Sequence, residues 1–97
     1  MEDNGIKKEL IVQIQTIAAQ NGVEKVILFG SRARGDHNKT SDIDLAVSGG
    51  NTAKFAVDIE EDTVTLLEYD IVDLAKPVNR DLLESIRKEG KVLYEKV

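Results

Sequence analysis

The chain has 97 residues, of which 41% are hydrophobic and 32% are charged, and its formal net charge is -5. This length predicts a single domain spanning residues 1–97, and the composition argues against a disordered chain. An acidic chain with only 4% aromatic residues is a poor candidate for direct binding of nucleic acid, which requires a basic face or stacking side chains. The sequence has no cysteine and no apolar run of about 20 residues that would predict a membrane span. We therefore expect a soluble, cytoplasmic protein.

The hydrophobic pattern predicts helices and strands in alternation. Residues 6–20 carry apolar side chains at helical spacing, and a short, continuous apolar run at 25–30 predicts a strand that is buried on both faces. The later predicted elements are a helical turn at 31–34, a strand at 41–48, a helix at 52–62 capped by Thr52, a strand at 69–74, a helix at 81–89 and a short edge strand within 91–97. Segment 63–67 is compatible with helix or with extended chain. This order predicts an α/β (α+β) sheet domain.

Two aspartates on one predicted strand are the first candidates for chemistry. Asp42 and Asp44 are two residues apart, so that their side chains leave the same face of a strand. Adjacent carboxylates repel each other unless a cation lies between them. Carboxylate oxygens suit a hard ion such as Mg²⁺ or Mn²⁺. The pair therefore predicts a metal site.

A Gly-Ser pair lies where the predicted buried strand passes into the helical turn. Gly30 lets the backbone approach a phosphate closely, and the N–H groups of the following turn favour an anion. Ser31 adds a hydroxyl donor. Arg32 and Arg34 add positive charge that could bind a triphosphate, although either could instead be a surface charge.

The strand at 69–74 offers a third carboxylate. Strand alternation places Asp70 and Asp73 on opposite faces, so only one of them can join Asp42 and Asp44. We expect Asp70 to be that residue. Three carboxylates could hold two metal ions, which is the arrangement that clamps the attacking and leaving oxygens in phosphoryl transfer.

The chain resembles the minimal nucleotidyltransferases of the DNA polymerase β superfamily. Their signature is similar to residues 29–47, which read FGSRARGDHNKTSDIDLAV. That signature is Gly-Ser, ten residues and Asp-x-Asp, and Gly30, Ser31, Asp42 and Asp44 fill it without a gap. The resemblance extends over residues 23–97. It implies the polymerase β catalytic-domain fold, a small mixed β-sheet with flanking helices.

The resemblance also implies roles for these residues. Asp42, Asp44 and Asp70 would ligate Mg²⁺, and Asp70 would help to deprotonate the attacking hydroxyl. Gly30 and Ser31 would hold the triphosphate of ATP. The reaction would be attack of a hydroxyl on the α-phosphate, with transfer of AMP and release of pyrophosphate.

The resemblance further implies a partner. Stand-alone members of the family are commonly paired with a separately encoded helical-bundle protein of the HEPN or substrate-binding type, and can act as antitoxins by adenylylating a tyrosine of that protein. We therefore expect assembly with such a partner or with a second copy. One alternative is a binding module that neutralises the partner by covering its surface, although three intact carboxylates favour the enzyme. The other is a small-molecule (antibiotic-type) nucleotidyltransferase, for which we see no acceptor-binding helical domain in the sequence.

Overall fold

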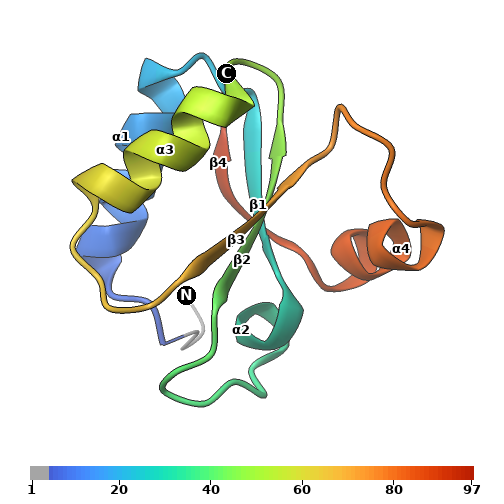
Figure 1. Cartoon of the computed structure of the whole chain (residues 1–97). Coiled ribbons are helices and arrows are strands. Elements are labelled where there is room, and N and C mark those ends of the chain that lie inside the picture. Colours follow the sequence, from blue (N-terminus) through green and yellow to red (C-terminus); the bar gives the residue numbers. More distant parts are fainter. Residues whose placement is uncertain (1–4) are drawn as a thin grey trace.

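A computed structural model describes residues 5–97, in which helices and strands alternate as the sequence predicts (Figure 1). In chain order the elements are α1 (Lys8–Gln20), β1 (Lys25–Phe29), α2 (Gly30–Arg34), β2 (Ile43–Ser48), α3 (Thr52–Asp62), β3 (Tyr69–Asp73), α4 (Arg80–Glu89) and β4 (Lys91–Glu95). Segment 63–67, which the pattern left ambiguous, is neither helix nor strand. No helix within residues 5–97 combines the length and the apolarity needed to cross a membrane.

The four strands form one mixed sheet in the order β3-β2-β1-β4. β1 is antiparallel to both β2 and β4, whereas β2 and β3 are parallel and are connected through α3. β4 lies at one edge of the sheet, which confirms the predicted edge strand. The helices α1 and α3 lie on one side of the sheet and α4 lies on the other, with α2 near one end (Figure 1).

Alternation along the strands divides the buried side chains between two hydrophobic clusters. The larger cluster joins α1 and α3 to one face of the sheet, and β2 contributes Ile43, Leu45 and Val47 to it. The smaller cluster lies on the other face and contains Phe29, Ala46 and Ile86. Because side chains two apart on a strand share a face, Asp44 leaves β2 on the same side as Ala46. The fold thus directs Asp44 toward the α4 side of the sheet.

Several predicted boundaries differ from the structure by one or two residues, among them the starts of α3 and β2. The N-cap of α3 is Asn51, whose side-chain oxygen accepts a hydrogen bond from the Lys54 N–H at 3.1 Å. The prediction of Thr52 as the cap was wrong, because Thr52 is already the first residue of the helix. β2 begins at Ile43, whose N–H pairs with the Glu68 carbonyl at 2.9 Å, so Asp42 precedes the strand.

Candidate active site

The pairing of β2 with β3 brings two of the predicted carboxylates together. Asp44 is the register partner of Asp70 in this parallel pair, and neighbouring strands lie about 4.8 Å apart. Asp42 lies near Asp44 because it is only two residues before Asp44 in the chain. Asp73 lies three residues beyond Asp70, and its carboxylate accepts a hydrogen bond from the Ala75 N–H at 2.9 Å. The structure therefore places Asp70, and not Asp73, beside Asp44.

The other two carboxylates act on Asp44. The pKa of Asp44 is raised above its ordinary value, first by burial and then by the negative charges of Asp70 and Asp42, while the positive charge of Arg34 offsets part of the effect. Within residues 5–97, none of the three carboxylates accepts a hydrogen bond or forms an ion pair. Asp58, by contrast, binds Lys54 at 2.8 Å. Closely spaced carboxylates without donors favour the binding of a cation.

This donor set fits a hard divalent ion in part. Carboxylate oxygens are the ligands that Mg²⁺ prefers, and Mg²⁺ usually completes its shell with water and substrate phosphates. Among the residues that the structure describes, no three His, Cys, Asp or Glu side chains are arranged so that they could hold a metal ion by themselves. Asp42, Asp44 and Asp70 could therefore supply part of a coordination shell, and a bound triphosphate could supply the rest.

Gly30 lies directly against this cluster. β1 ends where antiparallel β2 begins, with Phe29 paired to Asp44, so the next residue meets the Asp44 side chain. The backbone of Gly30 has a φ of +75°, and a Cβ added there would overlap the Asp44 carboxylate. Both the conformation and the space require glycine at this position.

Ser31 follows at the start of α2. Its carbonyl accepts hydrogen bonds from the N–H groups of Gly35 at 2.9 Å and Asp36 at 3.1 Å. Its hydroxyl has no hydrogen-bond partner among residues 5–97, and no side chain caps this helix. The hydroxyl is consequently available to donate to a ligand beside the carboxylates.

The two arginines of α2 have different surroundings. Arg32 has only 2% of its surface exposed, and its guanidinium donates to the carbonyls of Ser41 at 3.0 Å, Lys39 at 3.4 Å and Asn38 at 3.5 Å. These contacts secure the loop that leads to Asp42. The structure therefore gives Arg32 contacts within the protein, and its predicted contact with a triphosphate stays a prediction.

Arg34 is exposed and lies between two acidic residues. Its Nε donates to Asp36 at 3.0 Å, and its Nη1 donates to Glu89, the last residue of α4, at 3.1 Å. The positive charge is close enough to the cluster to lower the pKa of Asp44. The sequence did not identify Glu89 as a neighbour of the site. It lies 55 residues from Arg34, and no local pattern links the two.

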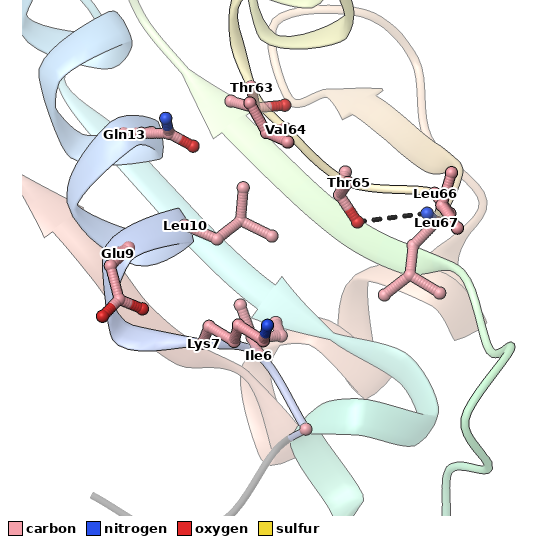
Figure 2. Close-up of a pocket in the computed structure, with 11 residues that line it drawn as sticks. Ile6, Lys7, Glu9, Leu10, Gln13, Thr63, Val64, Thr65, Leu66 and Leu67 are labelled. Carbon is pink, nitrogen blue, oxygen red and sulfur yellow. Dashed lines mark hydrogen bonds between the residues drawn. The ribbon is translucent and has the colours of Figure 1, made fainter.

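A cavity of about 710 Å³ lies elsewhere, between the N-terminal part of α1 and the 63–67 segment (Figure 2). It is lined by residues such as Leu10, Val64 and Leu66, and the dashed line in the figure is the 3.1 Å hydrogen bond between the Leu67 N–H and the Thr65 hydroxyl. None of the predicted site residues lines it. The candidate site is therefore identified by its chemistry and not by the volume of a cavity.

Comparisons with known proteins agree with this geometry. The family model "Polymerase beta, Nucleotidyltransferase" matches residues 12–97. "Putative protein adenylyltransferase MJ0604" of Methanocaldococcus jannaschii is 36% identical over 81 residues, which cover 74% of this chain and 79% of that protein.

Among solved structures, a chain in a mutant of the toxin-antitoxin MntA-HpeT superimposes with a TM-score of 0.66 at 23% identity, covering 89% of this chain and 73% of the other. A chain in a toxin-antitoxin structure with AMP-PNP gives a TM-score of 0.66 at 24% identity, covering 94% and 75%. These likenesses establish the same mixed four-stranded fold. Together with the family model, which spans most of the sequence, they lead to one conclusion: this chain belongs to the polymerase β nucleotidyltransferase family.

Proposed function

We propose that this chain is a Mg²⁺-dependent nucleotidyltransferase that transfers AMP from ATP to a tyrosine hydroxyl of a separately encoded helical partner of the HEPN type, as the antitoxin of a toxin-antitoxin pair. The observation that carries the proposal is the group of three carboxylates without donors, Asp42, Asp44 and Asp70, beside Gly30 and the available hydroxyl of Ser31. An anionic cluster next to a phosphate-binding turn suits a metal-bound triphosphate.

In the proposed reaction, the tyrosine oxygen forms a bond to the α-phosphorus of ATP. The bond from that phosphorus to the oxygen bridging to the β-phosphate breaks, and pyrophosphate leaves. Asp70, which is exposed beside Asp44, accepts the hydroxyl proton, while Ser31 and the N–H groups of its turn bind phosphate oxygens. Mg²⁺ held by Asp42, Asp44 and Asp70 would supply positive charge to the reacting phosphates.

The choice of nucleotide and acceptor is supported by the relatives. The relative from Methanocaldococcus jannaschii carries the name "Putative protein adenylyltransferase MJ0604", and one structural neighbour is a toxin-antitoxin protein with AMP-PNP, an analogue of ATP. Two of the neighbours described above come from toxin-antitoxin structures, which supports a separate protein as acceptor. We expect the reaction to occur in the cytoplasm, where ATP and a reducing environment suit a chain without cysteine.

The test is to incubate the purified chain with Mg²⁺ and ATP labelled in the α-phosphate, with and without the helical protein encoded beside it. We expect label on the partner, and we expect it to be lost when its acceptor tyrosine is replaced by phenylalanine. The variant Asp42→Ala/Asp44→Ala should abolish transfer, whereas Asp73→Asn, which alters a carboxylate on the opposite face, should retain it. A stable complex without transfer would refute the proposed reaction and would favour neutralisation by binding.

A further inference from the structure

The guanidinium of Arg34 is held from two sides. Nε donates to Asp36, which is a neighbour in the chain, and Nη1 donates to Glu89 on α4. The third nitrogen, Nη2, has no hydrogen-bond partner among residues 5–97. Two of the three nitrogens thus fix the plane of the group, and the third is left to donate to a ligand. A planar fork held in this way loses little freedom when it binds a phosphate.

The position of Arg34 relative to the carboxylate cluster supports such a contact. Arg34 is the last residue of α2, the short helix that begins with Gly30 and Ser31. Residues three apart on a helix lie on the same face, so Arg34 shares a face of α2 with Ser31. A triphosphate bound between Ser31 and metal ions on the aspartates would therefore lie within the field of Arg34.

The ion pair between Arg34 and Glu89 is better shielded from water than the pair between Arg87 and Glu84, which lies within α4. The side chains of Arg34 and Glu89 are 43% and 31% exposed, whereas those of Arg87 and Glu84 are 77% and 48% exposed. Screening by solvent weakens an exposed pair more than a partly buried one. Glu89 is therefore more able than Glu84 to hold its arginine in one place.

We infer that Glu89 is a positioning residue, which acts through Arg34 to orient a guanidinium nitrogen for the triphosphate of the incoming nucleotide. This inference rests on the proposed function and adds to it a contribution from α4, a helix that carries none of the predicted site residues. Asp36 provides the second, local support. Loss of Glu89 would leave Arg34 charged but less ordered, so nucleotide binding would weaken without loss of the carboxylates.

The test measures the affinity of the chain for ATP in the presence of Mg²⁺ by isothermal titration calorimetry. We expect Glu89→Ala to weaken binding about two- to fivefold, because a solvent-exposed ion pair contributes only modestly. Arg34→Ala should weaken binding at least as much, and Glu89→Ala should add nothing in the Arg34→Ala background. Glu84→Ala is the matched control on α4 and should bind ATP like the unmutated chain.

A second measurement separates the inference from the proposed function. In an NMR spectrum of the arginine side chains, recorded without nucleotide, Glu89→Ala should shift and broaden the Nε–H signal of Arg34, and Glu84→Ala should not. Equal ATP affinity of Glu89→Ala and the unmutated chain, or equal weakening with and without Arg34, would overturn the inference while leaving the proposed function standing. No binding of ATP by the unmutated chain would overturn the proposed function, and the inference with it.

Discussion

Replacement of Gly30 by alanine tests how closely the turn at Gly30 and the Asp44 carboxylate are packed. An L-residue in the left-handed region costs about 1–2 kcal/mol, and the φ of Gly30 is +75°. The added Cβ would also overlap the Asp44 carboxylate, and overpacking of this kind costs about 1–3 kcal/mol. Gly30→Ala should therefore lower the free energy of unfolding by about 2–5 kcal/mol.

The two costs can be separated with a matched control. Gly22 has a φ of +66°, and a Cβ added there would meet nothing within 4 Å. Gly22→Ala should thus show the backbone cost alone, about 1–2 kcal/mol. Urea unfolding of both variants should give a difference of about 1–3 kcal/mol, and thermal melts should show about 4–8 °C for each kcal/mol in a domain of this size.

A double-mutant cycle then assigns the difference to one contact. In the background of Asp44→Ala, the carboxylate that meets the new Cβ is absent, so Gly30→Ala should cost no more than Gly22→Ala. If Gly30→Ala were as mild as Gly22→Ala, or if removal of Asp44 gave no rescue, the close packing of Gly30 against Asp44 would be refuted.

Three further predictions follow from the site and its supports. Because the folded-state pKa of Asp44 is raised from 3.8, its ionisation destabilises the fold as the pH rises through that pKa; Asp44→Asn should raise the melting temperature near pH 7 without divalent ions, and the gain should vanish below pH 3.8. Asp70→Asn should reduce the rate of AMP transfer at least about 100-fold, as loss of a general base does, whereas Asp73→Asn should leave the labelling assay unchanged. Asn51→Ala should destabilise the protein by about 1 kcal/mol in urea unfolding because it removes the cap of α3, while Thr52→Ala should stay within about 0.5 kcal/mol.

Local patterns in the sequence predicted most of the fold. Helical spacing identified α1, whose apolar residues Leu10 and Ile14 are buried in the larger cluster. Alternation on β3 predicted that Asp70 and Asp73 would lie on opposite faces, and the parallel register with β2 places Asp70 beside Asp44. These features depend on residues a few positions apart, which is why periodicity captures them.

Features that depend on distant residues were not predicted. An arginine is ordinarily expected at the surface. Arg32 is nevertheless buried, because its guanidinium donates hydrogen bonds to the carbonyls of Ser41 and of the loop before it. The contact of Arg34 with Glu89 exists only because α4 packs against the side of the sheet where α2 ends. Such contacts arise from tertiary structure, and no spacing within one segment indicates them.

The unpaired state of the carboxylate cluster has a consequence for how this protein would evolve. Asp42, Asp44 and Asp70 contribute no hydrogen bond or ion pair to the described fold, and the burial of Asp44 in charged form weakens it. Substitutions that destroy the proposed chemistry should therefore leave a folded chain, and at Asp44 a more stable one. Selection for folding alone would tend to erase the cluster, so its persistence in a lineage would measure selection for the reaction itself.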